Sequence, residues 1–94
     1  MSEKNTKYLI KLICDNLADF LIEKNMRYGD SALKPRQTFY KGDAQNSILI
    51  RLDDKLSRIQ NSDQVRKNDC LDLVGYLILL MVDNDWTEFS EFLD

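Results

Sequence analysis

The stretch RKNDCLDLVGYLILLMVD, residues 66–83, decides the fold. Its apolar side chains recur at steps of three and four and also occupy many positions between, which predicts a helix that is apolar almost all round. Such a helix is typically the central member of a bundle, because it needs neighbours on more than one side. Its apolar run, 73–82, is shorter than the roughly 20 residues of a membrane helix. We therefore expect a helix inside a helical domain.

Two other segments have helical periodicity. In residues 3–24 the apolar positions three or four apart are Leu9, Ile10, Ile13, Leu17, Phe20 and Leu21. In residues 44–60, AQNSILIRLDDKLSRIQ, they are Ile48, Leu49, Leu52, Leu56 and Ile59. Each pattern predicts an amphipathic helix, and Asp43 is suited to cap the second one.

The last ten residues, DWTEFSEFLD, predict a short helix that is capped near Asp85 and turns Trp86, Phe89 and Leu93 inward. No segment alternates for long with a period of two. The predicted fold is all-α: a small helical bundle of three long helices plus a short C-terminal helix, in one domain over 1–94.

Composition narrows the classes of function. The chain is 44% hydrophobic and 31% charged, as in ordinary globular proteins, and its net charge of −3 argues against an extended nucleic-acid interface. No secretory peptide is visible, so a cytoplasmic location is expected, with Cys14 and Cys70 as small core residues. A chain without histidine has no catalytic triad, so any catalysis would use a metal or carboxylates.

Three acids interrupt the apolar pattern. Asp69 and Asp72 share one stripe of their helix, and Asp53 falls near the edge of the buried face of 44–60. Carboxylates one turn apart can hold Mg²⁺, and the basic residues of 44–60 could then neutralise a metal-bound phosphate; these are Arg51, Lys55 and Arg58. Alternatively, Asp53 and Asp72 pair with Lys or Arg of a neighbouring helix and fix its register. The residue types favour neither interpretation.

The stretch KNMRYGDSAL, residues 24–33, follows the first predicted helix. An amide such as Asn25 can read a base edge, the ring of Tyr28 can stack on it, and Arg27 can hold phosphate. The alternative is a helix stop, in which Asn25 and Gly29 end the helix and Tyr28 covers the edge of the core.

Three stretches, KNMRYGDSAL, ILIRLDDKLSRI and NDCLDLVGYLILL, resemble a group of small phage and prophage proteins. They also resemble the nucleotide-modification-associated domain, whose pattern includes a YGDS element and a D-x-K-x-x-R-I helix. More loosely, they are similar to the all-α nucleoside triphosphate pyrophosphatases of the MazG type. That resemblance implies Asp69 and Asp72 as Mg²⁺ ligands, joined by Asp53 or Asp54. Here Asp53 and Asp54 are adjacent, whereas those enzymes place two acids one turn apart.

The resemblance and the residues together predict a phage-type nucleotide-binding protein in the host cytoplasm. If this protein is an enzyme, it is expected to be a Mg²⁺-dependent nucleoside triphosphate pyrophosphohydrolase. The alternative is a non-enzymatic counter-defence protein. It would be either a sponge for a nucleotide signal or an inhibitor that binds a host protein through its acidic, aromatic C-terminus. Because the helix at 66–83 is so apolar, a homo-oligomer is expected, with no membrane partner.

Overall fold

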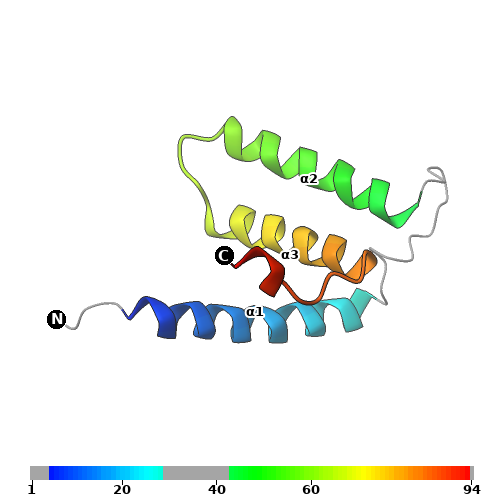
Figure 1. The fold of residues 1–94 in the computed structure, drawn as a ribbon. Helices are drawn as coiled ribbons and strands as arrows, with labels where there is room; N and C mark the ends of the chain where they lie inside the picture. The colour runs from blue at the N-terminus through cyan, green and yellow to red at the C-terminus, as the bar shows by residue number, and fades with distance from the viewer. Residues whose placement is uncertain (1–4, 29–42, 94) are drawn as a thin grey trace. The chain divides into compact units, whose positions relative to one another are not determined.

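The computed structural model describes residues 5–28 and 43–93, which belong to two compact units, 1–30 and 31–94 (Figure 1). Helix α1 spans Thr6–Tyr28, α2 spans Ala44–Gln60 and α3 spans Lys67–Asp83. A single 3₁₀ turn, η1, covers Ser90–Phe92. The described residues contain no strand, so the all-α prediction is confirmed. No helix among them combines the length and apolar character needed to cross a membrane.

The first unit is the helix α1. It begins after Asn5, whose Oδ1 accepts a hydrogen bond from the backbone N–H of Tyr8 at 3.0 Å, as an N-cap does. It continues to Tyr28, four residues beyond the predicted end. None of residues 5–27 is buried, and Cys14 is exposed, so the expectation that this cysteine belongs to a core is wrong.

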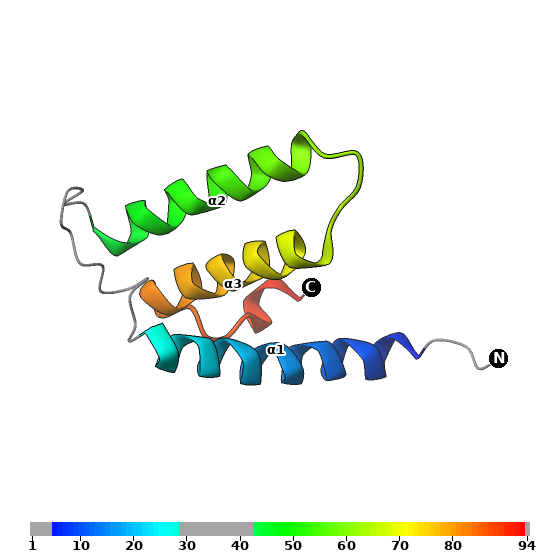
Figure 2. The same cartoon turned by 180° about the vertical axis from the view of Figure 1, so that it is seen from behind.

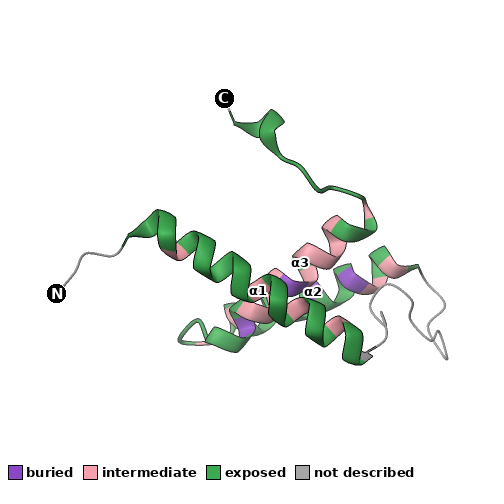
Figure 3. Ribbon diagram, turned by 90° about the horizontal axis from the view of Figure 1, so that it is seen from below, coloured by how far each residue is buried: buried purple, intermediate pink, exposed green. Residues whose placement is uncertain are grey.

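The second unit is built on α2 and α3, which lie side by side and run in opposite directions (Figures 1 and 2). Ile48 is completely buried and Leu52 nearly so, one helical turn apart on α2. On α3 the buried residue at mid-helix is Gly75, which has no Cβ and so permits a close approach of a neighbouring backbone. This strip is the core among the described residues (Figure 3).

The start of α2 confirms the predicted cap. Asp43 has extended backbone angles, and its Oδ1 accepts a hydrogen bond from the N–H of Asn46 at 2.7 Å. The bond satisfies one of the donors that the first helical turn leaves without a partner.

The end of α3 corrects the predicted C-terminal helix. The N–H of Trp86 bonds to the carbonyl of Met81 at 2.9 Å, and the N–H of Asp85 bonds to that of Val82 at 3.1 Å. This pair of bonds is the Schellman motif, and Asp85 occupies its left-handed position with φ of 57°. Asp85 therefore closes α3 and does not cap a new helix. The only helical element after it in the described residues is the turn η1.

The same motif gives a stability prediction. A non-glycine residue in the left-handed region costs roughly 1 kcal/mol, a little less for aspartate, and glycine avoids that cost. Asp85→Gly is therefore expected to raise the free energy of unfolding by about 0.5 kcal/mol. Urea unfolding followed by circular dichroism measures the change. Asp83→Gly is the matched control: it lies inside the last turn of α3 and should destabilise by about as much.

The segment after α3 leaves its apolar side chains exposed, which corrects the expectation that they face inward. Trp86, Phe89 and Leu93 are all exposed, as is Phe92 within η1. Cys70 on α3 is also exposed and is not the expected core residue. Figure 3 shows the chain from Asp85 to Leu93 in the exposed colour.

Glu88 fixes the local shape of this segment, and its side chain should have a lowered pKa. Glu88 Oε1 accepts a hydrogen bond from the N–H of Ser90 at 2.7 Å, and its contacts with Ser90, side chain first and then backbone, lower the pKa of Glu88. A lowered folded-state pKa means that the stabilisation is present above the ordinary glutamate pKa and is lost as the pH falls through the folded value. NMR titration should give Glu88 a pKa below the ordinary value of a glutamate side chain; an ordinary value would contradict the bond.

Candidate functional site

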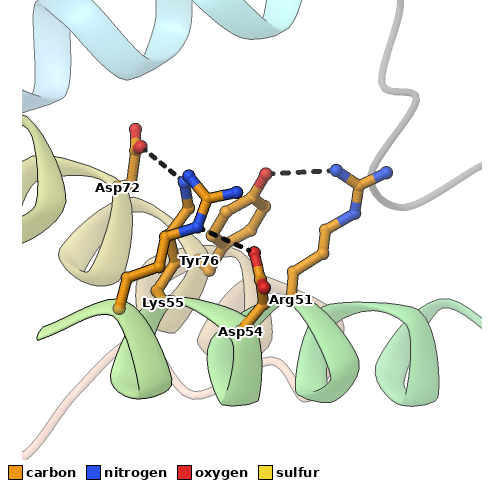
Figure 4. Close-up of polar contacts among 6 residues, drawn as sticks. Arg51, Asp54, Lys55, Asp72 and Tyr76 are labelled. Atoms are coloured by element: carbon orange, nitrogen blue, oxygen red, sulfur yellow. Dashed lines mark hydrogen bonds and ion pairs between the residues drawn. The ribbon is translucent and has the colours of Figure 1, made fainter. Parts of the chain in front are cut away.

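Polar side chains gather along the seam between α2 and α3 (Figure 4). We name this group the α2–α3 polar cluster; its members are Arg51, Asp54, Lys55, Arg58, Asp72 and Tyr76. The three bases follow one another at steps of four and three on α2, so they share one face of that helix. Asp72 and Tyr76 stand one turn apart on α3.

The innermost contact of the cluster is an ion pair between the helices. Lys55 Nζ lies 3.0 Å from Asp72 Oδ2, and the two side chains are only 16% and 27% exposed. Partial burial makes this pair stronger than a surface ion pair, and breaking it would leave a poorly hydrated charge. Asp72 thus forms the interhelical pair of the second interpretation given above.

Arg51 makes a different kind of contact. Its Nη1 donates a hydrogen bond to the hydroxyl oxygen of Tyr76 at 3.2 Å, and its Cζ lies 5.8 Å from the centroid of the same ring. Both contacts are with a neutral group, and no carboxylate pairs with Arg51 among the described residues. Arg51 is an exposed residue, and its guanidinium carries further N–H donors beyond the one bonded to Tyr76.

Arg58 closes the group on the surface side. Its Nε lies 3.4 Å from Asp54 Oδ2, four residues earlier on α2, and both side chains are about 60% exposed. Exposed pairs of this spacing contribute only about 0.3–0.5 kcal/mol, so an anion in solution can replace Asp54 readily.

The acids expected to hold Mg²⁺ belong to no group of three possible ligands among the described residues. Asp53 is exposed, Asp69 is buried in the first turn of α3, and Asp72 pairs with Lys55. Within 5–28 and 43–93, no three His, Cys, Asp or Glu side chains lie close enough to hold a metal ion. The magnesium prediction finds no assembled ligand set in this part of the chain, and it stays a prediction.

The residues expected to contact the base belong to the last turns of α1, in the other unit. Arg27 Nε bonds to Glu23 Oε1 at 3.0 Å, and Asn25 is half-buried. Tyr28 ends the helix, and its side chain lies outside the described residues, as do positions 29–33 of the KNMRYGDSAL stretch. Their proposed contacts with a nucleotide stay predictions.

Sequence reasoning missed Tyr76 as a partner of Arg51. The available signal was the spacing of four between Asp72 and Tyr76, which sets the hydroxyl one turn beyond the ion pair. Comparisons with protein-family models, curated proteins and solved structures find no match.

Proposed function

We propose that this protein binds a nucleotide by its phosphate groups at the α2–α3 polar cluster and holds it without hydrolysis. The observation that carries the proposal is Arg51, an exposed guanidinium held against Tyr76 with no carboxylate partner among the described residues. The resemblance to the nucleotide-modification-associated domain supports the choice of a nucleotide among the phosphate-bearing molecules.

Arg51 has the chemistry and the fixed position for this task. Its planar fork can give two parallel N–H bonds to phosphate oxygens, and such charge-assisted bonds are about twice as strong as neutral ones. The bond to Tyr76 holds the side chain in place, which reduces the entropy lost when a ligand binds.

Two further groups of the cluster can add to this contact. Arg58 lies seven residues from Arg51 on the same face of α2, and its weak pair with Asp54 leaves it open to exchange. A di- or triphosphate could therefore span both guanidinium groups. Lys55 lies between them but is neutralised by Asp72. It would contribute as a long-range charge that Asp72 largely cancels.

Retention of the intact ligand follows from the state of the acids. Hydrolysis of a nucleoside triphosphate to monophosphate and pyrophosphate needs a bound metal ion or a free carboxylate that acts as general base. Asp72 is engaged by Lys55, and the described residues provide no group of three acids close enough to hold a metal ion.

The test incubates the purified protein with a panel of nucleoside triphosphates, deoxynucleotides and cyclic nucleotides, with and without Mg²⁺. Filtration separates free from bound ligand, and mass spectrometry reads both fractions. We expect an intact nucleotide in the heat-released bound fraction. Monophosphate and pyrophosphate in the filtrate would instead identify the pyrophosphohydrolase, and an untouched panel would contradict nucleotide binding of either kind.

The variant Asp72→Asn distinguishes two roles for Asp72, as the counter-ion of Lys55 or as a Mg²⁺ ligand. If Asp72 is the counter-ion of Lys55, removing its charge frees the ammonium, and we expect affinity for the bound nucleotide to rise about threefold to tenfold. If Asp72 holds Mg²⁺, the affinity of this variant for the nucleotide in the presence of Mg²⁺ should fall. Isothermal titration calorimetry distinguishes the outcomes. Asp54→Asn is the matched control, and it should change affinity by less than about twofold because its pair is exposed.

A further inference from the structure

Residues 83–93, which we name the acidic aromatic segment, combine two properties. The segment carries four acids and no base: Asp83, Asp85, Glu88 and Glu91. It also exposes large apolar side chains, with Trp86 at 57% and Phe92 at 78%, together with Phe89 and Leu93. Isolated exposed apolar residues are normal on a protein surface, but several within so short a segment mark an interaction site.

The shape of this segment is set before any partner arrives. The Schellman bonds of Trp86 and Asp85 fix its exit from α3, the carboxylate of Glu88 holds Ser90, and the N–H of Phe92 bonds to the carbonyl of Phe89 at 3.1 Å. An ordered segment loses less conformational entropy on docking than a free tail does. It runs away from α2 of its own chain (Figure 3).

A surface of complementary chemistry is present on α2. Arg51 and Arg58 are exposed, and a guanidinium both bonds to carboxylates and stacks on aromatic rings. Arg51 has no carboxylate partner among the described residues, and the acidic aromatic segment offers carboxylates and rings together. The two guanidinium charges are opposite to those of the segment, which favours encounter, and Arg58 would exchange its exposed pair with Asp54 for a carboxylate of the segment.

We propose that the acidic aromatic segment of one copy docks on Arg51 and Arg58 of a second copy. Because each chain carries both surfaces, two copies can exchange segments reciprocally and close as a dimer with no surface left over. This inference is independent of nucleotide binding, although a phosphate on Arg51 would compete with the incoming carboxylate.

Sedimentation velocity over a concentration series, in low and high salt, tests the dimer. We expect concentration-dependent dimerisation that salt weakens, together with a blue shift of the emission of Trp86, the only tryptophan, as the dimer forms. Arg51→Glu and Glu91→Arg should each raise the dimer dissociation constant at least about tenfold, and combining them in one chain should restore it. Asp63→Arg, an exposed acid outside the segment, is the charge-matched control and should have little effect.

Phe92→Ser gives a second route to the same answer, because it weakens the apolar contact without changing charge. Circular dichroism confirms that each variant keeps its helices. A chain that stays monomeric at every concentration would overturn the proposal. So would a dimer that neither Arg51→Glu nor Glu91→Arg weakens, or a concentration-independent blue shift of Trp86, which would place the segment on its own chain.

Discussion

Replacing Ile48 with alanine is expected to lower the free energy of unfolding of the α2–α3 unit by about 3 kcal/mol. Ile48 is the one completely buried large side chain among the described residues, and Leu52 beside it is the other buried apolar residue. So small a core has few side chains that could relax into the cavity. Since small domains are stable by only about 5–15 kcal/mol, this loss is a large share of the total.

Ile50→Ala is the matched control for that experiment. It removes the same atoms from the same helix, but Ile50 is 57% exposed, so the change should stay within about 0.5 kcal/mol. Urea unfolding monitored by circular dichroism gives both values. Equal losses for the two variants would mean that α2 does not pack through the face that carries Ile48.

The second large effect concerns ligand binding at Arg51. Arg51→Met keeps much of the aliphatic stem and removes the guanidinium, so each lost charge-assisted bond should cost about 1.5–3 kcal/mol, or roughly ten- to a hundredfold in nucleotide affinity. Arg66→Met is the matched control: Arg66 is also exposed, and it precedes α3 outside the cluster. Calorimetry with the nucleotide found by the panel measures both.

Tyr76→Phe refines the Arg51 result. It removes the hydroxyl that accepts the bond from Arg51 but keeps the ring against which the guanidinium lies. A smaller loss than for Arg51→Met is expected, because Tyr76 positions the cation and the cation itself contacts phosphate. If Arg51→Met and Arg66→Met lowered the nucleotide affinity by similar amounts, only the net charge of the protein would matter, and this would contradict a specific site.

The periodicity of α2 and α3 predicted those helices closely. The bounds 44–60 agree with Ala44–Gln60, and 66–83 agrees with Lys67–Asp83 to within one residue. Asp43 was identifiable as a cap because its side chain needs only the local backbone. These features depend on neighbouring residues alone, which is why the sequence is sufficient for them.

Features that depend on tertiary geometry were not predictable in the same way. Leu49 and Leu56 share the apolar pattern of α2 but are exposed, because α3 covers only the strip around Ile48 and Leu52. Aspartate is favoured at helix starts and is also tolerated in the left-handed region, and in Asp85 the Schellman bonds decide for the second.

The candidate site, too, was predictable only where it depends on local structure. The spacing of Arg51, Lys55 and Arg58 on one face was readable from the sequence, since it follows from helical periodicity. The base that Asp72 meets was not readable in this way, because that contact depends on the register between α2 and α3. The pair of Lys55 with Asp72 settles that contact.

One NMR titration tests whether Arg51 binds phosphate. Adding ATP to ¹⁵N-labelled protein should shift the side-chain Nε–H signal of Arg51 and the backbone amide of Tyr76, and should leave the Nε–H signal of Arg66 in place. An unchanged Arg51 signal at saturating ATP, or equal shifts for Arg51 and Arg66, would contradict a specific phosphate site at Arg51.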